Sequence, residues 1–455
     1  MTSHIRATSS ETPATIKIAL AAFGLENRSV YKYLIRNGMD KSQITIADNE
    51  ELEDTPEGVA TIFGKDAFTQ LSDFDVVFRS PPIRHEDIKT DGLIWSSTNE
   101  FFKKCPSRII AVTGTKGKGT TSTLIANILN EAGIKAHLLG NIGSPALDSI
   151  EEIGKDDIAV YEMSSFQSWD LGGYNNSPTH KTPWAAPDTA VVLMIEPDHL
   201  DIHKDMQEYL GAKANLLKNQ TKDNLLVHHP SNPLTLEVVK GCMADKKAYQ
   251  TLQGAHVDSG EVIIDGQKIC SIGDIGLVGE HNLENVCAAV TAAWAYTQDT
   301  DAIAKACVEF KGLPHRLELA GVVDRVEYYD DSFATGVASS VAAVKSFPSK
   351  NKILIFGGYD KKIDVTDVLN ELNDKDTLIL IGQSADNLEA EAAKRNLNFV
   401  NLGSDLKMSE IVKKCADLAN NNSVVLLSPG HASFGMFESY KVRGDLFKFA
   451  VKDLT

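Results

Sequence analysis

The sequence predicts an α/β protein of three domains, each built on a mainly parallel sheet. Two observations favour this fold class. The chain has 455 residues, which is too many for one ordinary hydrophobic core. Short apolar runs of strand length alternate with helical patterns along the chain, as is typical of helices layered on parallel sheets.

The first predicted domain covers residues 1–106. An apolar strand at residues 16–20 leads into a turn around Gly24, and a helical pattern follows at residues 27–37. Further strands are expected at residues 43–47 and 75–78. This order is typical of a nucleotide-binding α/β domain, although no GxGxxG motif is present.

The second predicted domain, residues 107–312, carries a glycine-rich loop between a β-branched strand and a helix. Backbone N–H groups of such a loop converge on phosphate oxygens, and the helix N-terminus adds partial positive charge. We expect Lys118 to reach the terminal phosphates of ATP. Thr120 would hold Mg²⁺, although its hydroxyl stands one position later than usual because Gly119 intervenes. The predicted ATP-binding residues of the loop are Gly114, Thr115, Lys116, Gly117, Lys118, Gly119 and Thr120.

Two later strands of this domain end in polar residues. Glu162 follows the apolar strand at residues 158–161, and His199 lies in the polar segment that follows the strand expected at residues 190–195. The carboxyl ends of parallel strands form the ligand crevice of an open α/β sheet. The pattern therefore favours a Mg²⁺ and phosphate site at these strand ends.

The third predicted domain, residues 313–455, repeats the strand-then-loop pattern three times, with strands expected at residues 352–356, 377–381 and 423–427.

Composition excludes several classes of protein. The 45 basic and 62 acidic side chains give a net charge of −17, which argues against a nucleic-acid-binding surface. The apolar runs are too short to cross a bilayer, and residues 1–15 lack the apolar segment of a secretory signal. The six cysteines form no CxxC pair, which favours reduced thiols. We expect a cytoplasmic protein, without a membrane or nucleic-acid partner and monomeric.

Seven motifs, taken in order, resemble those of the Mur ligase family, and the match covers about residues 16 to 450. They are Gly-Thr-x-Gly-Lys from Gly114, Glu-x-Ser-Ser-Phe-Gln from Glu162, Asp-His-x-Asp from Asp198, Gly-x-His-Asn-x-x-Asn from Gly279, Leu-Pro-His-Arg from Leu313, Asp-Ser-x-Ala-Thr from Asp331 and Ser-Pro-x-x-Ala-Ser from Ser428. The resemblance implies a UDP-substrate-binding domain, a central P-loop ATPase-like domain and a Rossmann-like C-terminal domain that binds an amino acid.

The resemblance also implies an activity and residue roles. The activity is ATP-dependent ligation of an acid to an amino acid through an acyl phosphate, with two Mg²⁺ ions. Catalysis would fall to Lys118, Glu162, His199 and Lys213, and metal binding to Thr120, Glu162, His199 and, if carbamylated, Lys213. Further ATP contacts would be Asn282, Asn285, Arg316 and Asp331. Substrate contacts would be Asn141, Ser164, Gln167, Thr335, Lys361, Ser433 and Tyr440.

Carbamylation of Lys213 needs a neutral amine. An unperturbed lysine has a pKa of roughly 10.4, so only about one amine in a thousand is neutral near pH 7. Burial or a nearby cation must lower that pKa. Without the resemblance, a plain surface lysine on the helix expected at residues 206–217 is the simpler interpretation.

Within the family, the motifs at Glu162 and Asp331 are similar to those of the member that adds D-glutamate to UDP-N-acetylmuramoyl-L-alanine in peptidoglycan precursor synthesis. Phe333 stands where such members usually carry a lysine, which leaves the amino acid open, L-glutamate included. Gly119 slightly favours a folylpolyglutamate synthase-like ligase instead. A third alternative is a regulatory module that binds ATP without catalysis, for which Phe333 is the support.

Overall fold

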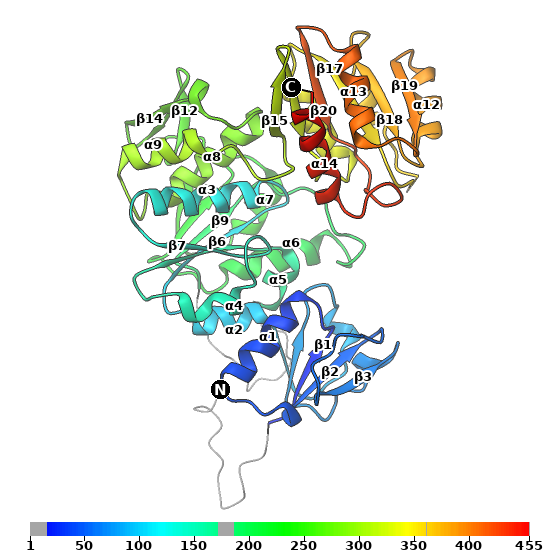
Figure 1. Ribbon diagram of the computed structural model, residues 1–455. Helices are drawn as coiled ribbons and strands as arrows, with labels where there is room; N and C mark the ends of the chain where they lie inside the picture. The colour runs from blue at the N-terminus through cyan, green and yellow to red at the C-terminus, as the bar shows by residue number, and fades with distance from the viewer. Residues whose placement is uncertain (1–15, 172–185, 361, 455) are drawn as a thin grey trace, which may run out of the picture. The chain divides into compact units, whose positions relative to one another are not determined.

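The computed structural model describes residues 16–171, 186–360 and 362–454 (Figure 1). The chain divides into two compact units. Unit 1 comprises Met1–Cys270 and Asn285–Ala306, and unit 2 comprises Ser271–Glu284 and Cys307–Thr455. The predicted boundaries at residues 106/107 and 312/313 stay a prediction.

The N-terminal part of unit 1 is a five-stranded parallel sheet in the order β3-β2-β1-β4-β5. Strand β1 is buried along its whole length, which explains its uniformly apolar sequence. The strands are β1 (Ile18–Ala21), β2 (Ile44–Asp48), β3 (Ala60–Phe63), β4 (Val76–Arg79) and β5 (Leu93–Trp95), and the helices are α1 (Leu25–Arg36) and α2 (Ser97–Lys104).

The central part of unit 1 is a six-stranded parallel sheet in the order β11-β10-β9-β6-β8-β7. Its strands are β6 (Arg108–Thr113), β7 (Ala136–Gly140), β8 (Ile158–Glu162), β9 (Thr189–Val192), β10 (Leu225–His228) and β11 (Asp245–Ala248). Helix α3 (Lys118–Glu131) packs against β6, β7 and β8. The apolar face that the sequence places on this helix, including Leu124, Ile125 and Ile128, is buried.

Further elements complete the central part. The helices are α4 (Ala146–Ser149), α5 (Ser165–Asp170), α6 (Met206–Ala214), α7 (Pro233–Val239), α8 (Glu280–Ala293) and α9 (Thr300–Glu309). The first residues of α8 and the last residues of α9 belong to unit 2. A separate three-stranded sheet consists of β12 (His256–Asp258), β13 (Glu261–Ile264) and β14 (Gln267–Ser271), of which β12 and β13 are antiparallel. The sequence analysis did not predict this sheet.

Unit 2 contains a six-stranded mixed sheet in the order β15-β16-β20-β17-β18-β19. All neighbouring pairs are parallel except the hairpin of β15 and β16. The strands are β15 (Glu318–Val323), β16 (Val326–Asp330), β17 (Asn351–Gly357), β18 (Thr377–Ile381), β19 (Asn398–Gly403) and β20 (Ser423–Leu427). The helices are α10 (Val337–Lys345), α11 (Thr366–Asn370), α12 (Ala385–Lys394), α13 (Met408–Leu418) and α14 (Tyr440–Lys452).

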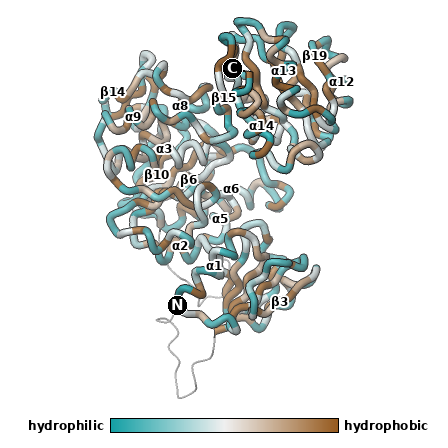
Figure 2. The backbone as a smooth tube through the Cα atoms, viewed as in Figure 1, coloured by the Kyte–Doolittle hydropathy of each residue, from teal (hydrophilic) through white to brown (hydrophobic). Residues whose placement is uncertain are grey.

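The structure confirms the predicted α/β class with parallel sheets, and hydrophobic residues gather along the strands (Figure 2). Two element ends differ from the prediction by three residues. The strand expected to run to residue 195 ends at Val192, because residues 193–195 leave the sheet toward the polar loop. The helix expected at residues 206–217 is α-helical only to Ala214, and a 3₁₀ turn at Asn215–Leu217 follows.

Candidate active site

The glycine-rich loop connects β6 to α3 and requires glycine at two positions. Gly117 has φ +83°, and a Cβ atom there would lie 2.1 Å from Oδ1 of Asn285. Gly114 has φ +150°, and its Cβ would lie 2.8 Å from Cβ of Leu193. The loop is therefore held closely against α8 and the segment after β9, with no space for larger residues.

The two lysines of the loop have different environments. Nζ of Lys118 donates a 2.9 Å hydrogen bond to the carbonyl of Thr115, which keeps the ammonium over the loop. Lys116 forms an exposed 2.8 Å ion pair with Glu196. Thr120 lies half-buried in the first turn of α3. Lys118 and Thr120 both lie in the first turn of α3 beside the glycine-rich loop, and their roles in phosphate and metal binding stay a prediction.

Lys213 of α6 is buried, with a relative exposure of 2%. Its Nζ donates a 2.8 Å hydrogen bond to the carbonyl of Gly114 and lies 4.7 Å from the ring centre of Tyr209. Burial, and to a smaller extent the charge of Lys118, hold the pKa of Lys213 well below its ordinary value, whereas Asp198 and Glu162 act in the opposite direction. The alternative interpretation of a plain surface lysine is therefore wrong.

The end of β8 supplies Glu162, which is buried, and the N-terminus of α5. Ser164 caps this helix: its hydroxyl accepts a hydrogen bond from the Gln167 N–H, and the Gln167 side chain accepts one from the Ser164 N–H. Nε2 of Gln167 also donates to Oε1 of Glu26 at 2.8 Å. Gln167, predicted to contact substrate, is thus engaged in holding α5 against α1.

His199 lies in the segment after β9 with a left-handed backbone, φ +54°. Its ring centre is 4.8 Å from that of Phe166, and its Nε2 is 3.5 Å from Oδ2 of Asp198. A non-glycine residue in this backbone conformation persists only where its surroundings fix it, as happens at functional sites.

One small cavity of about 150 Å³ joins these segments. Its lining residues are Gly114, Thr115, Lys118, Asn141, Ser164, Ser165, Phe166, Asp198, His199, Tyr209 and Lys213. Seven of the predicted site residues therefore meet around one cavity, although they come from five separate segments of the sequence. The sequence analysis missed Tyr209, whose hydroxyl is 2.8 Å from Oγ1 of Thr115 and whose pKa burial raises to about 12.

The donor set around this cavity fits magnesium, which prefers carboxylate and hydroxyl oxygens. Asp198 of the cavity lining supplies such oxygens, and further ones come from Glu162, two residues before Ser164, and Thr120, two residues after Lys118. A closer group of possible metal ligands lies elsewhere. Among the residues that the structure describes, the ligand atoms of His315, Glu318 and Asp330 in unit 2 lie within 4.8 Å of one another. Nζ of Lys448 lies 3.1 Å from Oε2 of Glu318, so the Lys448 ammonium already neutralises the Glu318 carboxylate.

Two of the predicted ATP contacts, Asn282 and Asn285, lie on the same face of α8. Asn282 is buried, and its Nδ2 donates a 2.7 Å hydrogen bond to the carbonyl of Val278. Asn285 is also buried, and its Oδ1 accepts a 3.4 Å hydrogen bond from Thr121. Asn285 thus holds α3 and the glycine-rich loop.

Unit 2 holds the remaining predicted residues. Asp331 is buried and accepts a 2.6 Å hydrogen bond from the Ser428 hydroxyl, and burial raises its pKa to about 7. The guanidinium of Arg316 lies 3.8 Å from the ring centre of Phe333. Ser433 is buried, whereas Thr335 is exposed and Tyr440 begins α14. Lys361 lies outside the described residues.

Arg443 of α14 was not singled out from the sequence. It is fully buried, and burial lowers its pKa to about 10. Its Nε donates to the Ser332 hydroxyl at 2.9 Å, and its other nitrogens donate to the carbonyls of Ser332 and His431 at 2.8 and 3.1 Å. Arg443 therefore joins the two loops that carry the predicted nucleotide and amino-acid contacts. No local motif marks such a residue.

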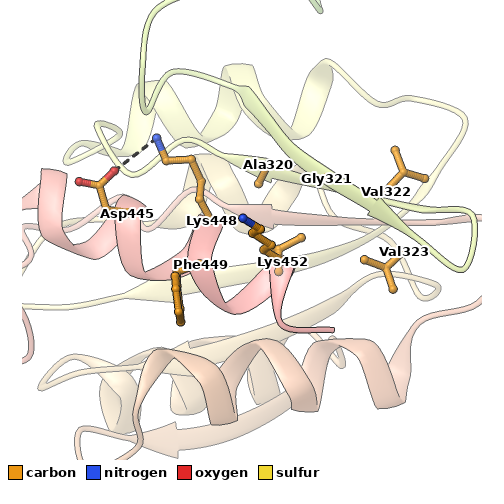
Figure 3. Close-up of a pocket in the computed structure, with 9 residues that line it drawn as sticks. Ala320, Gly321, Val322, Val323, Asp445, Lys448, Phe449 and Lys452 are labelled. Atoms are coloured by element: carbon orange, nitrogen blue, oxygen red, sulfur yellow. Dashed lines mark ion pairs between the residues drawn. The ribbon is translucent and has the colours of Figure 1, made fainter. Parts of the chain in front are cut away.

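A larger hollow of about 580 Å³ lies between β15 and α14 (Figure 3). It is lined by apolar side chains such as Val322 and Phe449, with the ion pair of Lys448 and Asp445 at its edge. None of the predicted site residues that the structure describes lines it, so the smaller cavity is the candidate active site.

The cavity is surrounded by a glycine-rich loop, two polar strand ends and a buried lysine. Together these features define a nucleotide-binding α/β enzyme. The family model of the Mur ligase middle domain matches residues 112–293, and that of the Mur ligase, glutamate ligase domain matches residues 315–431. The chain belongs to the Mur ligase family, and it is an ATP-dependent ligase.

Relatives from other organisms resemble the whole chain. The UDP-N-acetylmuramoylalanine–D-glutamate ligase of Acetivibrio thermocellus is 36% identical over 464 residues, covering 96% of each chain. The protein with the same name from Clostridium tetani is 33% identical over 458 residues, covering 96% of this chain and 97% of the relative.

Two solved structures share the fold. The UDP-N-acetylmuramate-alanine ligase MurC of Thermotoga maritima has a TM-score of 0.59 at 17% identity, covering 97% of this chain and 100% of that chain. The MurF ligase of the same organism, in complex with ADP, has a TM-score of 0.57 at 15% identity, covering 97% and 99%. Over the described residues, no helix of the present chain has the length and hydrophobicity needed to span a membrane.

Proposed function

We propose that this ligase joins D-glutamate to UDP-N-acetylmuramoyl-L-alanine, with ATP converted to ADP and phosphate. The buried Lys213, hydrogen-bonded to the phosphate-binding loop beside Lys118, carries the proposal for the reaction class. The shared name of the full-length relatives, D-glutamate ligase, supports the choice of substrates. Because ATP and the UDP-linked acceptor are both cytoplasmic compounds, we place the reaction in the cytoplasm.

The reaction begins at the acceptor carboxylate. One of its oxygens attacks the γ-phosphorus of ATP, the bond from that phosphorus to the β,γ-bridging oxygen breaks, and ADP leaves. The amine nitrogen of glutamate then attacks the acyl carbon of the resulting acyl phosphate and loses a proton. The tetrahedral intermediate expels phosphate as the amide bond forms. Positioning and charge neutralisation supply most of such catalysis.

The residues of the cavity have proposed roles in these steps. Lys118 would neutralise the transferred phosphoryl group, and Asn141 and Ser164 would contact the UDP-linked acceptor. Bound magnesium would add positive charge at the phosphates, held by Thr120, Glu162, His199 and a carbamate on Lys213. Low pKa favours that carbamate because CO₂ reacts only with the neutral amine.

The residues of unit 2 would bind the other two reactants. Arg316 and Asp331 would contact the nucleotide, as would Asn282 and Asn285. Thr335, Lys361 and Ser433 would contact the carboxylates of glutamate. We propose the three-domain division, at residues 106/107 and 312/313, as the functional division among acceptor, ATP and amino acid.

The experiment is an ADP-release screen with purified protein, ATP and Mg²⁺. UDP-N-acetylmuramoyl-L-alanine is combined in turn with D-glutamate, L-glutamate and other amino acids, and a folate acceptor is tested with L-glutamate. We expect ADP release only with the muramoyl acceptor and D-glutamate, with the amide product identified by mass. Release with L-glutamate or the folate acceptor would overturn the substrate assignment. Glu162→Gln should abolish release, whereas the exposed Glu151→Gln should not.

A further inference from the structure

Phe333 lies in the loop after β16 and has no role in the reaction described above. It is 38% exposed, although the acidic residues that precede it, Asp330 and Asp331, are buried. Its backbone N–H donates a 3.0 Å hydrogen bond to the carbonyl of His315. The loop that carries Phe333 is therefore fixed to the segment that carries Arg316.

The two side chains form a cation–π pair. The guanidinium carbon of Arg316 lies 3.8 Å from the ring centre of Phe333, well within the distance at which a ring face attracts a cation. The ring of Phe333 is in turn held by Tyr440, whose ring centre lies 5.0 Å away at an interplanar angle of 88°. Edge-to-face packing of this kind fixes the ring plane.

The backbone around Arg316 is also constrained. Its neighbours His315 and Leu317 both have left-handed backbones, with φ of +63° and +44°. The Leu317 N–H donates to Oδ1 of Asp331 at 3.3 Å, and the His315 N–H donates to Oε2 of Glu318 at 2.9 Å. Two strained residues on either side of one arginine require a surrounding structure that holds them, as at sites where a side chain is preorganised.

We propose that Phe333 is a positioning residue that orients the Arg316 guanidinium for the phosphates of ATP. The inference rests on the proposed function, since it takes Arg316 as a nucleotide contact. An ammonium at position 333 would repel the guanidinium at this distance, whereas the ring attracts it. In this chain the Phe333 ring therefore orients one cation, the Arg316 guanidinium, and no second cation at position 333 repels it.

The test compares ring-free and ring-bearing variants of the full-length enzyme. Phe333→Leu should raise the KM for ATP about two- to fivefold, the range that a cation–π pair at an exposed site is worth. Phe333→Tyr should restore the wild-type value, because it keeps the ring. The KM for the UDP-linked acceptor and the Tm should not change. Phe449→Leu, an exposed phenylalanine on α14, is the matched control and should behave as wild type.

A double-mutant cycle identifies the partner of the ring. In an Arg316→Met background, Phe333→Leu should have no further effect on the KM for ATP. An equal effect in both backgrounds, or a Phe333→Tyr variant as impaired as Phe333→Leu, would overturn the proposal. If the wild-type enzyme releases no ADP with any substrate pair, the proposed function fails instead, and the two failures are thus distinguishable.

Discussion

Nζ of Lys213 donates a hydrogen bond of 2.8 Å to the carbonyl of Gly114, across 99 residues of sequence. This bond places a buried amine directly against the phosphate-binding loop, with Lys118 close enough to lower its pKa further. Burial leaves an ammonium at this position poorly solvated, so the neutral amine is favoured. A carbamate there would convert an unfavourable buried cation into an anion facing Lys118.

The first prediction concerns this lysine. In protein equilibrated with ¹³C-bicarbonate, we expect a carbamate carbonyl signal by ¹³C NMR that is absent from Lys213→Ala. The variant should lose ADP-release activity by about 10- to 100-fold, as when a metal-site ligand's support is removed. Lys218→Ala, at an exposed lysine downstream, should keep both the signal and the activity. A signal that survives in Lys213→Ala would contradict carbamylation of this residue.

The second prediction concerns Gly117. A Cβ atom there would lie 2.1 Å from Oδ1 of Asn285, so Gly117→Ala must displace either the loop or the Asn285 side chain. We expect the Kd for a fluorescent ATP analogue to rise about tenfold or more, equivalent to about 1.4 kcal/mol. Gly133→Ala is the control, because Gly133 has a similar φ of +77° but nothing within 4 Å of the added atom. Equal Kd values in the two variants would show that the strained backbone alone, and not the collision with Asn285, weakens ATP binding.

The third prediction concerns Gly444, which lies inside α14. An added Cβ would lie 2.2 Å from Nδ1 of His315 and 2.5 Å from Oδ2 of Asp330, two atoms that are 2.7 Å apart in a buried pair. Gly444→Ala should therefore lower the free energy of unfolding by about 1–3 kcal/mol. Gly211→Ala, in α6 with open space around it, should raise it by about 0.5–1 kcal/mol. Urea denaturation measures whether the free energy of unfolding falls in Gly444→Ala and rises in Gly211→Ala.

The fourth prediction is a pH dependence caused by Asp331. Burial raises its pKa from the ordinary value of 3.8 to about 7 in the folded state. Between about pH 4 and 7 the folded protein holds a proton that the unfolded chain has released. The free energy of unfolding therefore falls as the pH rises through this window, and the contribution of this proton is lost above the folded-state pKa.

Asp331→Asn has no such proton to lose. The free energy of unfolding of the variant, minus that of the wild type, should therefore increase from about pH 4 to 7 and then level off. Urea midpoints measured across this range test it, with the exposed Asp374→Asn as the control. A difference that is constant with pH would show that Asp331 titrates normally.

Much of the fold and about half of the candidate site could be predicted because local sequence encodes them. The strand at Arg108–Thr113, the glycine-rich turn and the helix from Lys118 follow one another directly, so propensity and turn chemistry specify the phosphate-binding loop. The hairpin of β15 and β16 and the small sheet of β12 to β14 were missed. Strands β12 and β15 have no buried residue, so they lack the continuous apolar run that marks the buried strands.

The sequence by itself determined the α/β class, the phosphate-binding loop and the polar strand ends, because each depends on residues a few positions apart. Only the tertiary structure decided that Lys213 is buried against Gly114, that Arg443 joins Ser332 to His431, and that Phe333 supports Arg316. The physical reason is that burial and pKa depend on which distant segments pack together. A side chain such as Lys213 has the same local sequence whether it ends in water or in the protein interior.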